Sequence, residues 1–273
     1  MKIGIFDSGL GGLGVGLRMI DALPQYDTIY LGDTQRVPYG NRSQATIYDF
    51  TREAIDYLVA QGCLLVILAC NTASAEALRR IQQEHVPSHY PDRKVLGVLI
   101  PAAEVAARSG QRIGVIATAG AVASGAWPRE INRIDPSREV FQQATPLLVP
   151  LVENDGLKWA EPILAEYLAP LLAHKIDTLV LGCTHYIFLK EMAQKLAPGV
   201  NVISPEELMP GALADYLRRH AEITSRLSKG DTHEFLLTDV TSEYLKMARR
   251  MTGREFVFRQ VSLSHGLANP PLQ

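Results

Sequence analysis

The segment LVILACNT, residues 65–72, determines the fold expected for this chain. It is a continuous apolar run, partly β-branched, that ends in a small residue, a cysteine, an amide and a hydroxyl. A second segment, TLVLGCTH at residues 178–185, repeats this pattern. Continuous apolar runs are typical of parallel strands whose two faces are both covered by helices. Two of the three cysteines, Cys70 and Cys183, therefore follow matching strands.

Strand patterns alternate with helical patterns along the chain, which indicates βαβ units and a mostly parallel sheet. The segment QRIGVIAT (111–118) also parallels KIGIFDS (2–8). The spacing from Ile3 to Ile113 is close to that from Cys70 to Cys183, and this agreement indicates an internal duplication. We therefore predict an α/β fold of two similar, pseudo-symmetric domains, residues 1–97 plus 209–273 and residues 98–208. Further strands are expected at 28–31, 95–98 and 234–238, and helices at 13–22, 43–61 (with Ser43 as its N-cap), 73–84, 159–174, 212–220 and 242–251.

The composition is that of an ordinary globular protein. The chain has 273 residues, 47% of them hydrophobic, and a formal net charge of −2. This balance favours neither nucleic acid nor a membrane surface as a partner. Met1 runs directly into a strand pattern, and no apolar run is long enough to span a membrane, so we expect a cytoplasmic protein with reduced thiols.

The glycine-rich turn GLGGLG at residues 9–14 satisfies the dinucleotide-binding pattern G-x-G-x-x-G. It follows a strand and opens a helix, and Asp33 lies where a ribose-binding acid is expected. Against a nucleotide, the Asp7 carboxylate directly ahead of the glycines would repel a pyrophosphate. Glycines that simply allow a tight strand-to-helix turn are the favoured explanation, and a nucleotide-dependent oxidoreductase is kept as an alternative.

The cysteines differ in their surroundings. Cys63 is expected to be a small buried hydrophobic residue without a role in the chemistry. Cys70 and Cys183 each lie at the carboxyl end of a strand and the start of a helix, where ligands bind in open α/β sheets. Backbone N–H groups there can lower the pKa of a thiol from about 8.5. No short ligand spacing indicates a metal, and a disulfide is not expected in the cytosol.

Two thiols that face each other across a domain interface suit stereoinversion. One takes a proton from one face of a carbon acid, and the other returns a proton to the opposite face. A cysteine hydrolase would need only one of the pair. A non-catalytic amino-acid-binding protein is a further alternative.

Several motifs resemble those of the cofactor-independent glutamate racemases, in the aspartate/glutamate racemase superfamily. They are DSGLGG (7–12), PYG (38–40), ACNTASA (69–75), SGA (124–126), PLVE (150–153) and GCTHY (182–186). The resemblance implies two α/β domains with the active site between them. It also implies racemisation of L-glutamate to D-glutamate for the bacterial cell wall, with neither pyridoxal phosphate nor a metal. For the oligomeric state, a homodimer is the default expectation.

The resemblance also assigns roles to residues. Cys70 matches the thiol that acts on the D-enantiomer and Cys183 the thiol that acts on the L-enantiomer. Asp7 and His185 match the groups that assist them, and Glu153 matches a further assisting carboxylate. The substrate-binding set is Asp7, Ser8, Pro38, Tyr39, Gly40, Asn71, Thr72, Thr118, Thr184 and His185. Ala121, Ile187 and the extra glycines Gly14 and Gly16 depart from the pattern, and Ala121 puts substrate-carboxylate binding in question.

Overall fold

The computed structural model describes residues 1–263, whose strands form two separate sheets. One sheet has the order β10-β9-β2-β1-β3-β4 and the other the order β6-β5-β7-β8. All neighbouring strands in both are parallel, which confirms the predicted fold class. The strands are β1 (Lys2–Asp7), β2 (Thr28–Gly32), β3 (Cys63–Leu68), β4 (Lys94–Gly97), β5 (Arg112–Ala117), β6 (Glu139–Ala144), β7 (Thr178–Gly182), β8 (Asn201–Ile203), β9 (His233–Leu237) and β10 (Phe258–Gln260).

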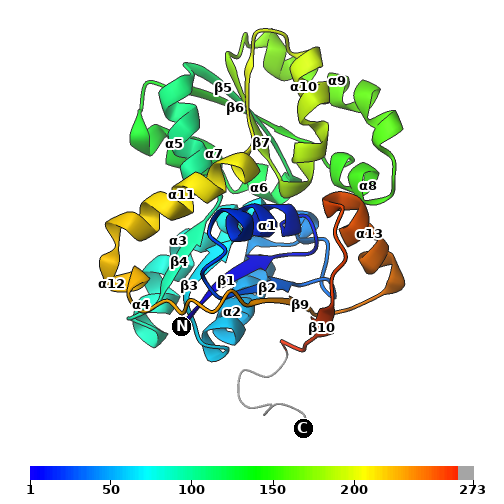
Figure 1. Cartoon of the computed structure of the whole chain (residues 1–273). Helices are drawn as coiled ribbons and strands as arrows, with labels where there is room; N and C mark the ends of the chain where they lie inside the picture. The colour runs from blue at the N-terminus through cyan, green and yellow to red at the C-terminus, as the bar shows by residue number, and fades with distance from the viewer. Residues whose placement is uncertain (264–273) are drawn as a thin grey trace.

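The two sheets repeat one topology. The order β2-β1-β3-β4 within the larger sheet recurs as β6-β5-β7-β8 in the smaller. The strands that precede Cys70 and Cys183, β3 and β7, therefore occupy equivalent places beside β1 and β5. The larger sheet is completed by β9 and β10 from the end of the chain, which lie beside β2. In Figure 1 the sheets lie one above the other, with helices around each.

Helices connect the strands and cover both faces of each sheet (Figure 1). Ser43 caps α2 by accepting a hydrogen bond from the Thr46 amide, as the sequence predicted. The α-helices are α1 (Leu13–Ala22), α2 (Gln44–Ala60), α3 (Asn71–Arg80), α4 (Val86–His89), α5 (Leu99–Ser109), α6 (Ala119–Ala123), α7 (Ala126–Ile134), α8 (Leu148–Glu153), α9 (Ala160–Ala173), α10 (Lys190–Leu196), α11 (Pro205–Arg219), α12 (Ala221–Thr224) and α13 (Ser242–Thr252). Shorter turns are the 3₁₀ segments η1 (Tyr39–Asn41), η3 (Leu157–Trp159) and η4 (Thr184–Leu189), and the π-helical η2 (Ile81–His85).

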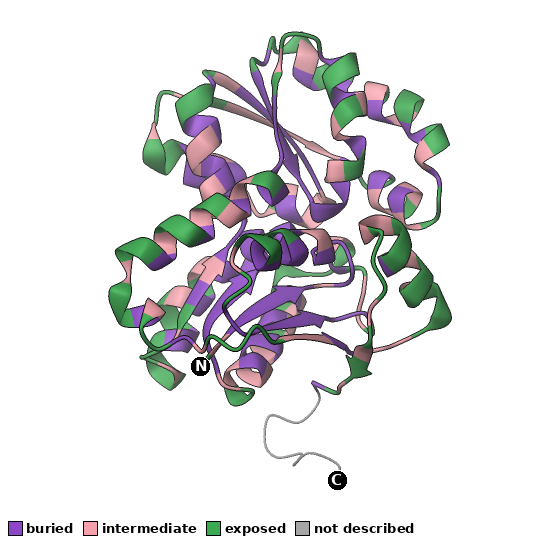
Figure 2. Cartoon of the chain, viewed as in Figure 1, coloured by how far each residue is buried: buried purple, intermediate pink, exposed green. Residues whose placement is uncertain are grey.

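The strands are continuous apolar runs because both faces of each sheet are buried in apolar cores. Leu65 and Ile67 of β3 pack into the core on one face of their sheet, and Val66 and Leu68 pack into the core on the other. The smaller sheet likewise lies between two apolar cores. Figure 2 shows the strands of both sheets largely buried. Among residues 1–263, no helix is both long and apolar enough to cross a membrane.

Some elements differ from the sequence prediction. The strand β6 (EVFQQA) was not expected, because an edge strand that is only half-buried lacks a continuous apolar run. Helix α11 begins at Pro205, well before the expected start at position 212, since proline is favoured in a first helical turn. The segment after Cys183 is the 3₁₀ turn η4 rather than an α-helix.

Candidate active site

A cavity of about 240 Å³ lies where the carboxyl ends of β3 and β7 meet, and both Cys70 and Cys183 line it. The loop after β2 contributes residues 37–41, and the start of α8 contributes Val149 and Pro150. Of the residues that the sequence assigned to catalysis or substrate binding, all except Asp7 line this cavity. They are Ser8, Pro38, Tyr39, Gly40, Cys70, Asn71, Thr72, Thr118, Glu153, Cys183, Thr184 and His185.

The Cys70 sulfur is held by the start of α3. It accepts a hydrogen bond from the Ala73 amide at 3.4 Å and lies 3.3 Å from the Ser8 hydroxyl. Burial nevertheless raises the pKa of Cys70 to about 12, and the nearby Asp7 carboxylate adds to this effect. The Ala73 amide at the helix start does lower the pKa of this thiol, as the sequence predicted, but the net shift is upward. Desolvation and a like charge outweigh the donors of the helix start.

Asp7 lies behind the cavity rather than in its wall, with a side chain only 1% exposed. One carboxylate oxygen accepts a hydrogen bond from the Gly9 amide at 2.9 Å. The other oxygen is buried without a hydrogen-bond partner among the described residues. Burial raises the pKa of Asp7, against the lowering effects of the Gly9 amide and the His185 charge. Asp7 therefore lies within electrostatic reach of both Cys70 and His185.

The Cys183 side of the cavity is built differently. Cys183 is extended, with φ −149° and ψ 141°, and its side chain caps no helix. Its sulfur lies 3.7 Å from Nδ1 of His185. On the other side of the imidazole, Nε2 lies 3.0 Å from Oε1 of Glu153, within ion-pair distance but without the alignment of a hydrogen bond.

His185 is a strongly perturbed group. Burial lowers its pKa, but its contacts with Cys183 and Glu153 outweigh burial and raise the pKa to about 10. The imidazole is therefore protonated near neutral pH. Its positive charge lies beside the Cys183 sulfur, which is 3.7 Å from Nδ1.

The glycine-rich turn packs closely against the side chains of the site. A Cβ on Gly12 would come within 2.5 Å of an Asp7 carboxylate oxygen, and a Cβ on Gly11 would meet the His185 ring. Asp33, the candidate ribose-binding acid, is fully buried and accepts hydrogen bonds from Tyr39 at 2.6 Å and Thr238 at 2.9 Å. Side chains thus fill the space that a pyrophosphate would need at the start of α1, and Asp33 supports the Tyr39 loop instead.

Asn71 has the properties of a ligand-binding side chain. It is 2% exposed and lines the cavity, and neither atom of its amide has a hydrogen-bond partner among the described residues. Buried polar groups are almost always paired, so this amide is available to a polar ligand. Next to it, Thr72 Oγ1 lies 2.9 Å from Thr118 Oγ1, which joins the start of α3 to the end of β5.

The sequence missed part of the cavity wall. The missed residues come mainly from the loop after β2 and from the stretch 145–154, which includes α8: Gly9, Val37, Asn41, Ala119, Thr145, Pro146, Val149, Pro150 and Asn154. Thr145 follows a strand whose sequence carries no apolar run, so only the PLVE motif signalled this region. Of the departures from the motif pattern, Ala121 donates its amide to Thr118 Oγ1 at 3.3 Å, and Ile187 lines a second, smaller cavity.

The fold and the site define an α/β enzyme class in which a small cavity lies between two parallel sheets and carries a cysteine from each. Residues 17–209 match the sequence model of the family described as Asp/Glu/Hydantoin racemase. A glutamate racemase of Geobacter metallireducens is 41% identical over 261 residues, 92% of this chain and 92% of that protein. The chain therefore belongs to the Asp/Glu/hydantoin racemase family, and it is a racemase.

Solved structures agree with this assignment. The glutamate racemase of Francisella tularensis, in complex with D-glutamate, superposes with a TM-score of 0.87 at 30% identity, covering 96% of this chain and 98% of that one. The glutamate racemase of Thermus thermophilus, in complex with β-chloro-D-alanine, gives a TM-score of 0.79 at 34% identity, covering 97% of this chain and 98% of that one.

Proposed function

We propose that this racemase interconverts L- and D-glutamate by proton transfer between Cα and two thiols, without a cofactor. One observation carries the proposal: Cys70 and Cys183 line the same small cavity, each from the end of an equivalent strand. Glutamate is proposed as the substrate because similar proteins are glutamate racemases, one of which matches over 92% of this chain. A cavity of about 240 Å³ suits a small amino acid.

The reaction starts with the thiols in opposite protonation states. Cys183, beside the cationic His185, acts as a thiolate and removes the α-proton of L-glutamate. Cys70, whose pKa is raised to about 12, is a thiol and donates its proton to the opposite face of Cα. One C–H bond breaks and one forms, and the products are D-glutamate, a Cys183 thiol and a Cys70 thiolate. From D-glutamate the two thiols exchange roles.

The intermediate carbanion has to be stabilised by this chain's own groups. Its negative charge spreads onto the substrate carboxylate, where fixed donors stabilise it most strongly. The Ser8 and Thr184 hydroxyls line the cavity and supply such donors. So does the Asn71 amide, which has no hydrogen-bond partner within residues 1–263. Enclosure of the cavity between the sheets also limits the access of water to the carbanion.

We assign residues 1–97 plus 209–273 to one domain and residues 98–208 to the other. We also place the protein in the cytoplasm, where its product D-glutamate is used for peptidoglycan synthesis.

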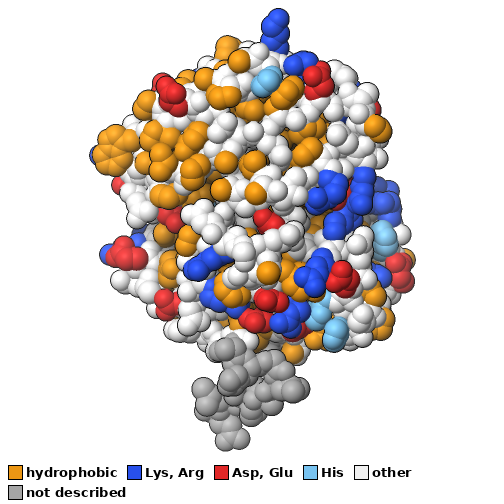
Figure 3. All heavy atoms as spheres, turned by 180° about the vertical axis from the view of Figure 1, so that it is seen from behind, with side chains coloured by type: hydrophobic (Ala, Val, Ile, Leu, Met, Phe, Trp, Pro, Cys, Tyr) orange, Lys and Arg blue, Asp and Glu red, His pale blue; other side chains and the backbone are white. Residues whose placement is uncertain are grey.

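We also propose a homodimer. Leu147 and Trp159 are 53% and 58% exposed, and Figure 3 shows hydrophobic side chains gathered on the upper part of the rear face. Sedimentation equilibrium tests the dimer by its mass.

The activity is tested by incubating the purified protein with L- or D-glutamate in deuterated water, with no added cofactor. The proposal expects the opposite enantiomer, carrying deuterium at Cα. Parallel reactions with aspartate test the side-chain preference. Folded protein that neither inverts nor exchanges glutamate contradicts the proposal. Restored growth of a bacterium that depends on supplied D-glutamate tests the role in the cell.

A further inference from the structure

Each thiol lies close to a fully buried tyrosine that does not line the cavity. Tyr30 of β2 and Tyr186 of η4 are both 0% exposed. Tyr30 is hydrogen-bonded to Gly9, next to Ser8, whose hydroxyl lies 3.3 Å from the Cys70 sulfur. The Tyr186 amide donates a hydrogen bond of 3.0 Å to the carbonyl oxygen of Cys183. Both phenols are therefore near a reacting sulfur, yet the mechanism above uses neither of them.

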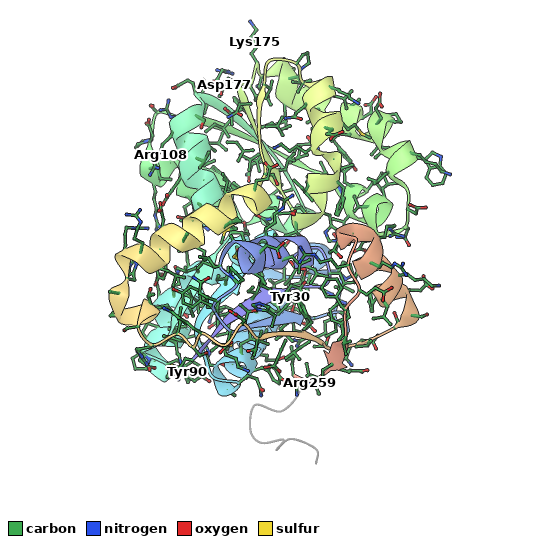
Figure 4. All side chains as sticks on the ribbon, viewed as in Figure 1. Tyr30, Tyr90, Arg108, Lys175, Asp177 and Arg259 are labelled. Carbon is green, nitrogen blue, oxygen red and sulfur yellow. The ribbon has the colours of Figure 1, made fainter. Side chains whose placement is uncertain are left out.

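On the Cys70 side, Tyr30 holds the turn that follows β1. Its hydroxyl donates a hydrogen bond of 2.8 Å to the carbonyl oxygen of Gly9. This turn also carries Ser8, whose hydroxyl lies 3.3 Å from the Cys70 sulfur. Figure 4 places Tyr30 beneath α1, in the lower half of the molecule. Gly16 of α1, one of the extra glycines in the sequence, leaves room for this ring: a Cβ there would lie 3.2 Å from it.

On the Cys183 side, Tyr186 holds the 3₁₀ turn that carries Thr184 and His185. Its hydroxyl lies 2.6 Å from Oγ1 of Thr145 and 3.2 Å from the Thr145 carbonyl oxygen. Thr145 is itself fixed, because its Oγ1 also donates to the carbonyl oxygen of Ala117 at 3.1 Å. Cys183 has no helix cap of its own, so this contact ties its turn to the neighbouring strand β5.

We propose that Tyr30 and the Thr145–Tyr186 pair are positioning residues, each of which orients one of the two reacting thiols. Tyr30 acts on the Cys70 side through Gly9 and Ser8, and Tyr186 acts on the Cys183 side through the turn η4. Buried side-chain networks of this kind hold reacting groups within the narrow range of geometry that proton transfer requires. This inference rests on the proposed two-thiol function.

Reaction rates alone cannot separate the two sides. Enantiomers in water have equal free energies, so any variant lowers kcat/KM equally in the two directions. Primary isotope effects do separate them. In the proposed mechanism, deuterium at Cα of L-glutamate is removed only by Cys183, and deuterium at Cα of D-glutamate only by Cys70. A variant that slows one transfer makes that step more rate-limiting, which raises its isotope effect and lowers the other.

The experiment measures isotope effects on kcat/KM in both directions for the wild type, Tyr30→Phe and Tyr186→Phe. We expect kcat/KM to fall about three- to tenfold in each variant, as for loss of one hydrogen bond. Tyr186→Phe should raise the isotope effect for L-glutamate and lower that for D-glutamate, and Tyr30→Phe should do the reverse. Isotope effects that stay unchanged, or that move together in both variants, overturn the proposal.

Partner variants test the Tyr186 contact without changing the tyrosine. Thr145→Val should shift the isotope effects as Tyr186→Phe does, and the double variant should be no worse than either single one, because both remove the same contact. Thr145→Ser keeps the hydroxyl and should restore the wild-type isotope effects. An additive double variant, or no recovery with Thr145→Ser, counts against the contact.

A matched control separates positioning from general stability. Thr51 of α2 is buried, and its hydroxyl donates to the Ile47 carbonyl oxygen at 2.7 Å, within a helix and outside the cavity wall. Thr51→Val should leave both isotope effects unchanged. Failure of the two-thiol function itself is recognised separately, because the wild type would then show no inversion, or Cys70→Ala and Cys183→Ala would retain it.

Discussion

The two sides of the cavity occupy equivalent places in two sheets of the same topology, but their chemistry differs. Cys70 caps α3, and its sulfur accepts a hydrogen bond from the Ala73 amide. Burial raises the pKa of this thiol to about 12. Cys183 caps no helix and lies beside His185, whose pKa is raised to about 10. Two sheets of the same topology therefore place two like thiols in unlike electrostatic surroundings. The proposed mechanism uses this difference, because in it one thiol acts as a base while the other acts as an acid.

The largest expected effect is the loss of either thiol. Cys70→Ala and Cys183→Ala should each lower racemisation by about 10²–10⁴-fold, the contribution of a general acid or base. Cys63→Ala is the matched control, since Cys63 is fully buried and does not line the cavity. Racemisation is measured by circular dichroism in both directions. If either Cys70→Ala or Cys183→Ala retains full activity, the proposal that both thiols transfer a proton is contradicted.

The next effect is confined to the Cys183 side. His185→Asn removes the cation beside the sulfur and should lower racemisation by about 10²-fold. Glu153→Gln, which keeps the size of the side chain that contacts His185, should cost about tenfold or less. In both variants the isotope effect should rise for Cα-deuterated L-glutamate and fall for the D-enantiomer. If the isotope effects for the two enantiomers instead change in the same direction and by the same amount, His185 does not act on Cys183 alone.

The raised pKa of His185 also predicts a pH dependence of stability. Its pKa in the folded protein, about 10, lies above its ordinary value of 6.5, so folding favours the protonated imidazole. The resulting stability is fully present below about pH 6.5 and is lost progressively as the pH rises towards 10. Denaturant unfolding between about pH 6.5 and 9 should therefore show a decline in the wild type that is shallower in His185→Asn. Parallel slopes for the two proteins would contradict the raised pKa.

The smallest expected effect concerns the contact that joins the two sides. Thr118→Val removes the hydroxyl that lies 2.9 Å from Thr72, and KM should rise about three- to tenfold while kcat changes less. Both isotope effects should stay close to those of the wild type, because the contact does not belong to one thiol. Thr118→Ser should restore KM. Isotope effects that move in opposite directions for the two enantiomers would instead assign Thr118 to one thiol.

Local sequence patterns predicted much of the fold. The apolar runs before Cys70 and Cys183 are strands, and Ser43 caps the helix expected after it. Patterns failed where an element has no continuous apolar face. The edge strand β6 is such a case, and with it Thr145 was missed. The extra glycines were also visible only as departures, since nothing in the sequence shows that Gly16 packs against Tyr30.

The sequence alone determined which residues are candidates for the chemistry. The repeated strand and cysteine pattern, its nearly constant spacing along the chain, and the motifs around Asp7 and His185 can all be read from short segments. Local patterns carry such information because strand and turn preferences depend on neighbouring residues.

Only the tertiary structure decided how those residues differ in charge and exposure. It placed Asp7 behind the cavity, raised the pKa of the Cys70 thiol, and brought Glu153 to 3.0 Å from His185. It also left the Asn71 amide unpaired in the cavity wall, among the described residues. Burial and electrostatic interactions depend on groups that are far apart in the chain, so no local pattern contains them.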